Sequence, residues 1–386
     1  MNKKLLLVFS FITIALVSLG ACSAGTTGDG EKVQKITLYS VGGADDLFEI
    51  WIPAFEEATD GKYQIEYARG NPQEVINKIK AAGDNNNIDI VSTGVDGLNL
   101  GVKEGIWEQL YPEYSEEIRY DELTDIAKTY LDENDGYGAI KNTDPGGPIL
   151  VYNKDKVPNP PKTYEELKDW IKENPGKFTY ADISNSGPSR GFFFGLAQSL
   201  GEDFSSGEEL TKTFEYLKEI DQYIDYYPSQ SSDVFDLLFD GTIDIAPHMP
   251  LWYANVKNVG EVPDNFEQIR LEDAKQVIDS QFLVIPKELP ENRREAALEF
   301  IEFVMSSEIN AQQYQVGRVP GNENASSDHI FDEYQDQYKG YIEHVLPDFV
   351  KDGNAYVPEG DWVLFPKNEV IVEYYEDWEN IIQANK

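Results

Sequence analysis

The sequence predicts an α/β protein with two lobes, in which each lobe has a mostly parallel sheet flanked by helices. Strand-like and helix-like patterns alternate along residues 36–91, and a β-α-β-α-β order makes neighbouring strands parallel. The alternation resumes after residue 148, which indicates a second lobe. A chain of 386 residues is longer than one hydrophobic core usually supports, and 41% of apolar residues is enough for a large folded interior.

In the first part of the chain, strands are expected at residues 36–40, 63–67 and 88–91. A helix after the first strand is indicated by apolar residues at i, i+3, i+4 and i+7, from Phe48 to Phe55. Pro53 lies within this stretch, and we expect it to kink the helix or to mark its true start. A shorter helix is expected around Val75 and Ile79.

The second part begins after a break rich in proline and glycine at residues 144–148. Thr163, with Glu166 three residues later, forms a capping box that predicts a helix ending at about Asn174. Further strands are expected at residues 149–152, 178–183, 243–246 and 282–285. Further helices are expected around residues 210–217, 235–239, 297–304 and 370–381.

Residues 1–21 have the pattern of a secretory signal peptide, with two lysines, an apolar run and small residues before Cys22. The Leu-Gly-Ala-Cys sequence resembles the lipobox of bacterial lipoproteins, which implies that Cys22 is acylated and becomes the new N-terminus. The alternative is an ordinary secretion signal with an incidental cysteine. Residues 22–32 are small and polar, as in a flexible tether. We expect an exported protein held at the outer face of the cell membrane by lipid alone, since no other stretch reaches the roughly 18 apolar residues of a membrane span.

The chain is strongly acidic, with 70 Asp and Glu against 32 Lys and Arg and a formal charge of −38. Nucleic acid and anionic lipid are bound by clustered basic side chains, so neither is expected as a partner. Cys22 is the only cysteine, which excludes a disulfide within the chain. The three histidines lack metal-ligand spacing, and no phosphate-binding or dinucleotide fingerprint occurs. Neither a metal nor a cofactor is therefore expected.

Four segments are distinctive, and they read IDIVSTGVDGLNLGVKEGIWEQL (88–110), ILVYNKDKVPNPPKTYEEL (149–167), GTIDIAPHMPLWYAN (241–255) and EAALEFIEFVMSSEINAQQYQ (295–315). In this order they resemble the bacterial extracellular solute-binding proteins of ABC importers, including the maltose-binding proteins. The resemblance implies a two-lobed, periplasmic-binding-protein-like fold with mixed sheets, hinge crossings and a ligand in the cleft. It also implies a monomer that hands a small solute to the permease subunits of the importer and performs no chemistry.

The resemblance further implies where the lobes and the ligand lie. The lobes are expected at residues 33–146 plus 282–320 and at residues 147–281 plus 321–386. Hinge crossings are expected near residues 144–149, 279–283 and 319–322. A sugar or another polar organic solute is the expected ligand. Residues 173–203, however, are closer to relatives that bind polyamines, iron, thiamine-like ligands or phosphonates, so a polyamine, iron or phosphonate/carboxylate receptor is the alternative.

Ligands of α/β sheets bind beyond the carboxyl ends of the strands, and four loops in such positions carry candidate ligand-binding residues. After the first strand, Asp45 and Asp46 follow two glycines and offer carboxylates to hydroxyl or ammonium groups. The alternative is that one of them caps the next helix. Asp96 aligns with a ligand-binding acid of the maltose-binding relatives, although Gly97 replaces the basic residue that follows it there.

The third loop contains Ser186, Ser189 and Arg190 at the expected start of a helix. Free backbone N–H groups at a helix start favour an anion, and Arg190 could clamp a carboxylate or phosphonate. The alternative is a plain helix start, with Arg190 paired to a nearby acid.

The fourth loop contains His248, Trp252 and Tyr253. Trp and Tyr rings suit stacking on a sugar face or on a cation. Trp362 lies where the relatives place another aromatic residue of the cleft. For these aromatic residues the alternative is packing in the core.

An enzyme is the alternative from a different functional class. Residues 187–191 match the G-x-S-x-G motif, which makes Ser189 a candidate nucleophile of a surface esterase. Three histidines follow it in the order that an esterase needs. Pro188 directly before the serine, bulky phenylalanines after the motif and the lack of an oxyanion-hole motif argue against this hypothesis. We therefore expect a receptor.

Overall fold

The computed structural model of the chain describes residues 33–41 and 46–385. The expected signal peptide, the tether, Cys22 and Asp45 lie outside the described residues. The side chain of Asp46 is also outside the description, although its backbone begins a helix.

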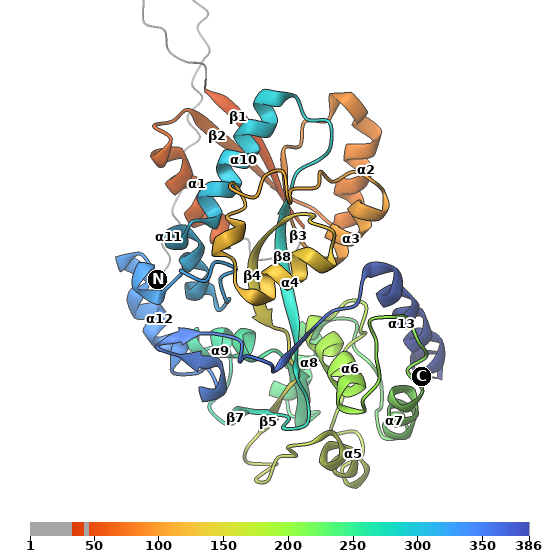
Figure 1. Cartoon of the computed structure of the whole chain (residues 1–386). Helices are drawn as coiled ribbons and strands as arrows, with labels where there is room; N and C mark the ends of the chain where they lie inside the picture. The colour runs from red at the N-terminus through yellow and green to blue at the C-terminus, as the bar shows by residue number, and fades with distance from the viewer. Residues whose placement is uncertain (1–32, 42–45, 386) are drawn as a thin grey trace, which may run out of the picture. The chain divides into compact units, whose positions relative to one another are not determined.

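The first sheet has the strand order β11-β8-β3-β1-β2, and β4 also pairs with β8. Its strands are β1 (Gln34–Ser40), β2 (Tyr63–Arg69), β3 (Ile90–Gly94), β4 (Ala139–Pro145), β8 (Gln276–Val284) and β11 (Trp362–Leu364). β1 pairs in parallel with both β2 and β3. Helices α1 (Asp46–Ala58) and α2 (Pro72–Ala82) connect these three strands (Figure 1). The predicted β-α-β-α-β order is confirmed, because helical crossovers bring successive strands back in the same direction.

Helix α1 runs through Pro53, so the prediction that Pro53 marks the true start of the helix is wrong. A proline inside a helix costs about 3 kcal/mol. Phe48, Trp51 and Phe55 lie on one face of α1 and are almost wholly buried. Burial of such side chains contributes about 1.5–3 kcal/mol each, which more than offsets the proline.

The long strand β8 makes the first sheet mixed rather than parallel. It pairs antiparallel with β3 and β4 and parallel with β11. In Figure 1, β8 extends from the neighbourhood of β3 towards the second sheet. β4 was not expected, because its sequence AIKNTDP has no apolar alternation.

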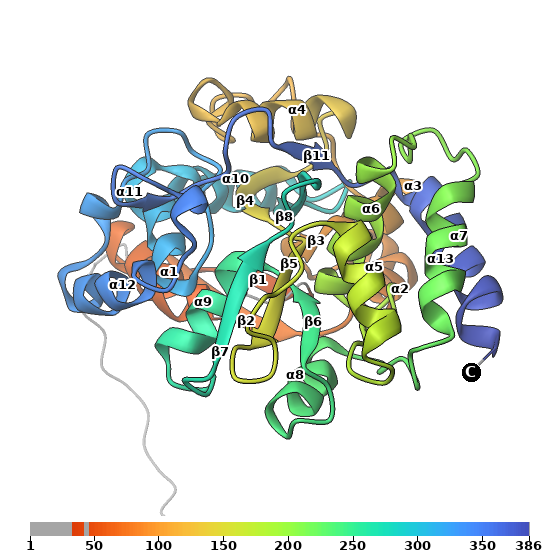
Figure 2. The same cartoon turned by 90° about the horizontal axis from the view of Figure 1, so that it is seen from below.

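The second sheet has the strand order β6-β5-β7 (Figure 2). Its strands are β5 (Ile149–Asn153), β6 (Ile245–His248) and β7 (Phe266–Arg270). Both pairs are antiparallel, so the expected parallel pairing does not occur in this sheet.

The strand predicted at residues 178–183 is wrong: this segment makes one isolated parallel bridge, from Phe178 to Ile245. The reason is that other polar groups of the segment bond to a loop at residues 226–228. The backbone N–H of Asp182 donates to the carbonyl of Pro228, and the hydroxyl of Thr179 donates to the carbonyl of Tyr226.

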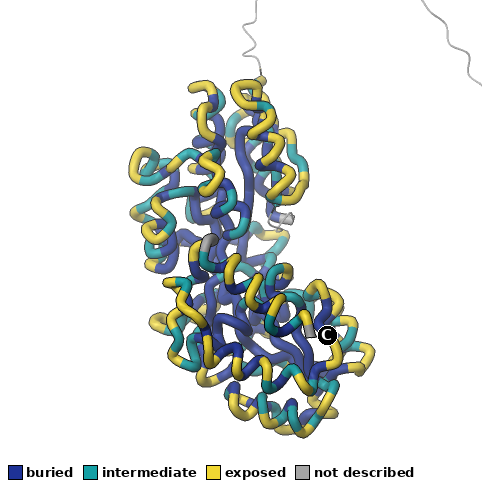
Figure 3. The backbone as a smooth tube through the Cα atoms, turned by 90° about the vertical axis from the view of Figure 1, so that its right-hand side faces the viewer, coloured by how far each residue is buried: buried dark blue, intermediate teal, exposed yellow. Residues whose placement is uncertain are grey.

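Helices flank both sheets, and buried residues of helices and strands form two hydrophobic clusters. Figure 3 shows where the buried parts of the backbone lie. The remaining helices are α3 (Val95–Lys103), α4 (Asp125–Glu133), α5 (Tyr164–Glu173), α6 (Gly187–Ser199), α7 (Thr211–Asp221), α8 (Ser231–Phe239), α9 (Pro250–Asn258), α10 (Glu291–Met305), α11 (Ser307–Asn310), α12 (Gln335–Ile342) and α13 (Asn368–Ile381). A two-stranded hairpin of β9 (Val350–Lys351) and β10 (Asn354–Ala355) precedes β11. Within the described residues, no helix combines the length and the hydropathy needed to cross a membrane.

The capping prediction for α5 is confirmed in its first half. The Thr163 hydroxyl accepts the backbone N–H of Glu166 at 3.2 Å. The Glu166 carboxylate accepts the N–H of Lys162 instead of that of Thr163. Both bonds satisfy groups at the start of the helix.

The three segments expected as hinge crossings lie side by side. Asp144 on β4 is directly opposite Asp279 on β8. The backbone N–H of Thr143 donates to the carbonyl of Val319, and Asn142 forms a bridge with Pro320. These three adjacent segments therefore connect the regions of the two sheets. The expected lobe boundaries on either side of them stay a prediction.

Candidate functional site

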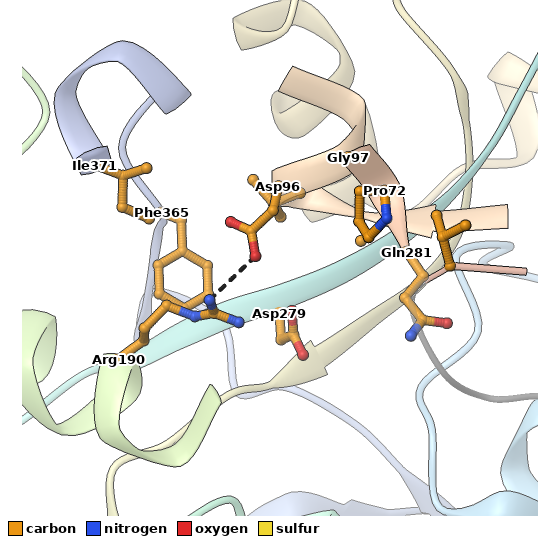
Figure 4. A pocket seen from close by; sticks show the side chains of 11 residues that line it. Pro72, Asp96, Gly97, Arg190, Asp279, Gln281, Phe365 and Ile371 are labelled. Atoms are coloured by element: carbon orange, nitrogen blue, oxygen red, sulfur yellow. Dashed lines mark hydrogen bonds and ion pairs between the residues drawn. The ribbon is translucent and has the colours of Figure 1, made fainter. Parts of the chain in front are cut away.

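A cavity of about 270 Å³ lies at the carboxyl end of β3, beside the start of α3 (Figure 4). Its lining comes from the first sheet and its helices, from α6, and from the segment after β11. The lining residues are Val41, Pro72, Gly94, Val95, Asp96, Gly97, Arg190, Asp279, Gln281, Phe365 and Ile371. This position is the one at which α/β sheets bind ligands.

A second cavity of about 250 Å³ adjoins the first and shares three lining residues with it, Arg190, Asp279 and Gln281. The rest of its lining comes from β4, the starts of α6 and α9, and the segment at residues 316–318. We call the two adjoining cavities the cleft. Parts of the chain from both sheet regions line it, so a bound solute would contact both.

Arg190 and Asp96, two of the predicted site residues, form an ion pair in the cleft. Nη1 of Arg190 donates to Oδ2 of Asp96 at 3.1 Å (Figure 4). The same nitrogen lies 3.3 Å from the hydroxyl of Tyr375 and 3.4 Å from the carbonyl of Ser184. Burial lowers the pKa of Arg190, but Tyr375 and the acids around it outweigh this effect and raise the pKa. Because Asp96 belongs to α3 and Arg190 to α6, the pair joins elements of the two sheet regions.

A second ion pair lies at the other end of the cleft, between Asp144 and Arg318. Nη1 of Arg318 donates to Oδ2 of Asp144 at 2.8 Å. The backbone N–H of Val319 and the amide of Asn142 also donate to this carboxylate, at 2.8 and 2.9 Å. Burial raises the pKa of Asp144 to about 6, against the opposing effects of Arg318 and Val319. Both oxygens of the Asp144 carboxylate therefore accept hydrogen bonds.

Asp279 lines both cavities, and it is one of two cleft acids that sequence reasoning missed, the other being Asp144. Burial raises its pKa, and the nearby Arg190 and Arg318 lower it in part. Its carboxylate is in no ion pair among the described residues. The sequence signal was present: Asp279 is the one charged residue in the strand QVIDSQFLV.

Trp252 lines the second cavity and is 39% exposed, whereas His248 is buried beneath it. The imidazole of His248 stacks on Phe235 with a centroid distance of 4.3 Å, and its centroid lies 4.8 Å from that of Trp252. Nδ1 of His248 lies 3.1 Å from the carbonyl of Met249, so the neutral ring donates there. Burial lowers the pKa of His248 to about 4. His248 therefore packs against the Trp252 ring and does not line the cleft.

Tyr253 points away from the cleft into the core of the second sheet region. Its ring is almost wholly buried, and its hydroxyl donates to the carbonyl of Phe266 at 2.8 Å. Trp362 is half-buried on β11 and lines a separate cavity of about 600 Å³, together with Thr124 and Val319. The structure therefore does not bring Tyr253 or Trp362 to the cleft.

Ser186 and Ser189 form the first turn of α6 and are buried. The Ser186 hydroxyl caps the helix by accepting the backbone N–H of Ser189 at 3.3 Å, and it also accepts the Ser189 hydroxyl at 2.9 Å. A further contact of 2.7 Å joins Ser186 to the hydroxyl of Ser231. None of the hydrogen bonds of the described residues links Ser189 to a histidine. The G-x-S-x-G motif thus acts as a helix start in this fold.

Within residues 33–41 and 46–385, no three His, Cys, Asp or Glu side chains are placed to hold a metal ion together. The polar groups of the cleft are instead carboxylates, guanidinium groups and one amide, next to the face of Trp252. Such groups bind a ligand through charge and hydrogen bonds.

The fold and the cleft define a two-lobed ligand-binding protein. The family model described as bacterial extracellular solute-binding protein matches residues 51–339, and the chain belongs to this family. The family and the fold that the sequence resemblance implied are confirmed. No curated protein sequence matches the chain.

Several solved structures share the fold at low sequence identity. One is an ABC transporter from Clostridium perfringens, with 18% identity, a TM-score of 0.68, and coverage of 90% of this chain and 99% of that chain. Another is the spermidine/putrescine substrate-binding protein PotD from Streptococcus pneumoniae, with 18% identity, a TM-score of 0.63, and coverage of 92% and 100%. Maltose-bound MalE3 from T. maritima has 14% identity, a TM-score of 0.65, and coverage of 91% and 94%. The fold alone thus accommodates proteins with different named ligands.

Proposed function

We propose that this protein captures a small polar organic solute in the cleft and delivers it to the permease subunits of an ABC importer. The observation that carries the proposal is that two adjoining cavities, lined from both sheet regions, share Arg190, Asp279 and Gln281. A solute that contacts both sides favours the closed arrangement, because its binding energy is larger there. The Arg190–Asp96 pair supports the same arrangement, since it also spans the two sides.

The protein acts at the outer face of the cell membrane, held there through an acyl chain on Cys22. Membership of an extracellular solute-binding family supports export. A sugar is one candidate, supported by the hydrogen-bonding side chains, by the exposed part of Trp252 and by the likeness to the maltose-bound MalE3. The surface esterase hypothesis has less support, since the Ser189 hydroxyl is buried and bonded to Ser186.

Trp252→Ala is the direct test of the site. A buried aromatic anchor contributes about 2 kcal/mol or more to binding, which corresponds to a loss of roughly 30-fold in affinity. The ligand is first found by thermal-shift screening of sugars, polyamines, phosphonates and other polar solutes, and its affinity is then measured by calorimetry. Tyr226→Ala is the matched control, because Tyr226 is 48% exposed and lines neither cavity of the cleft.

Affinity unchanged in Trp252→Ala would remove the second cavity from the site. Delivery is tested separately by uptake of the labelled solute in cells with and without the protein. Uptake that is equal in both would contradict the importer role while leaving capture intact.

A further inference from the structure

Five charged side chains line the cleft within the described residues. Arg190 and Arg318 are the two cations, and Asp96, Asp144 and Asp279 are the three acids. Each cation is paired with one acid: Arg190 with Asp96 and Arg318 with Asp144. Among the described residues, the cleft therefore has one carboxylate more than it has cations.

The extra carboxylate is that of Asp279. It lies beside Arg190 in Figure 4, but the ion pair drawn there joins Arg190 to Asp96. On its other side, Asp144 is the cross-strand neighbour of Asp279, and like charges that face each other across strands are destabilising. Asp279 is half-buried, and a carboxylate that is partly withdrawn from water without a cationic partner costs free energy.

The start of α6 offers a partial compensation, because Gly187 and Pro188 line the second cavity. A helix N-terminus is equivalent to only about half a positive charge, and that charge is shared with the ion-paired Arg190 of the same turn. The Ser186 hydroxyl also satisfies one N–H of this turn. The excess negative charge of the cleft is thus reduced but not removed.

The aromatic residue of the second cavity also favours a cation. Trp252 lines the cavity with Asp279 and exposes 39% of its surface. An aromatic face attracts a cation through its quadrupole, and the attraction grows as water is excluded.

We propose that the captured solute carries a net charge of +1, with a cationic nitrogen placed at Asp279 within reach of the Trp252 ring. This inference rests on the proposed function and specifies its substrate class as organic cations with an ammonium or guanidinium group. Neutral sugars lack the charge that would balance Asp279. Anions would add to the excess charge.

The first experiment needs no ligand. Asp279→Asn keeps the shape of the side chain and removes the unbalanced charge. We expect the melting temperature of the ligand-free protein at pH 7 to rise by about 1–3 °C. Asp336→Asn is the matched control, because the Asp336 side chain is 99% exposed and pairs with Lys339 at the surface. A melting temperature that is unchanged or lower in Asp279→Asn would show that Asp279 is balanced within the protein and would overturn the inference.

The second experiment compares matched probes by thermal shift and calorimetry. Glucosamine is compared with glucose, choline with glycine betaine, and 4-aminobutanol with 1,4-butanediol, and glucose 6-phosphate serves as the anion. We expect binding by a cationic member only, and a loss of about 10- to 100-fold in its affinity in Asp279→Asn. Asp336→Asn should leave the affinity unchanged.

The outcomes separate the two proposals. Tighter binding by a neutral or anionic probe, or equal affinity in wild type and Asp279→Asn, would overturn the charge inference and leave solute capture in place. No binding by any probe, together with no response in the wider screen of solutes, would count against solute capture itself.

Discussion

His248 is predicted to make the protein less stable in mild acid. Its imidazole is buried between Phe235 and Trp252, and Nδ1 donates to the carbonyl of Met249. Nε2 is buried and has no hydrogen-bond partner among the described residues. A proton added at Nε2 would place a charge there without an acceptor, which is the physical reason that burial lowers the pKa of His248 from 6.5 to about 4.

The sign and size of the effect follow from proton linkage. A histidine whose pKa is lowered in the folded state stabilises the protein above its unfolded pKa, and this contribution is lost as the pH falls towards the folded pKa. Between pH 7 and pH 5 the unfolded chain takes up about three quarters of a proton at His248, and the folded chain takes up about a tenth of one. Integration over this range gives a loss of about 2 kcal/mol in the free energy of unfolding.

The assay is urea unfolding at pH 7 and pH 5 for the wild type and for His248→Asn. We expect the wild type to lose about 2 kcal/mol more than the variant over this range. Comparison with the variant is necessary because Asp144 acts in the opposite direction: its raised pKa of about 6 makes the folded state more favourable as the pH falls. His344→Asn is the control, since His344 is exposed and bonds through its backbone carbonyl. Equal pH dependence of wild type and His248→Asn would refute the reasoning.

Two further predictions concern the membrane anchor and the crossing between the sheet regions. Cys22→Ser should release the protein from the membrane fraction, and a variant that still sediments with membranes would contradict acylation of Cys22. Gly191→Ala should lower the melting temperature, because its Cβ would lie 2.2 Å from the carbonyl oxygen of Gly146, a backbone atom of the crossing segment. Gly187→Ala is the milder control, because its Cβ would meet the flexible Met249 side chain at 3.3 Å. Equal stability of the two variants would contradict close packing of α6 against the crossing segment.

The sequence predicted the elements whose apolar pattern is local. β1, β2 and the helix between them were found because their buried residues repeat at the spacing of a strand or a helix. β4 was missed because residues 141–144 of this strand are polar or charged and yet buried. The partners that allow this burial lie far along the chain: Asn310 donates to the carbonyl of Lys141, and Val319 donates to Asp144. Such partners leave no signal in a local pattern.

The candidate site shows the same limit. Asp96 and Arg190 were singled out from their positions after a strand and at a helix start, and the structure brings both to the cleft. Ser189 and Tyr253 were singled out by the same kind of reasoning, but their side chains turn into the fold. A loop position predicts that a residue is near the carboxyl end of a strand, whereas the direction of its side chain depends on packing. The pairing of Arg190 with Asp96 could not be predicted, because 94 residues separate them.

That pairing changes which residue determines the charge preference of the cleft. Taken singly, Asp96 suits a cation and Arg190 suits an anion, so the sequence supported both ligand classes. Once they bind each other, their charges cancel, and the Asp144–Arg318 pair cancels in the same way. The preference then falls to Asp279, which β8 places at the crossing between the two sheet regions.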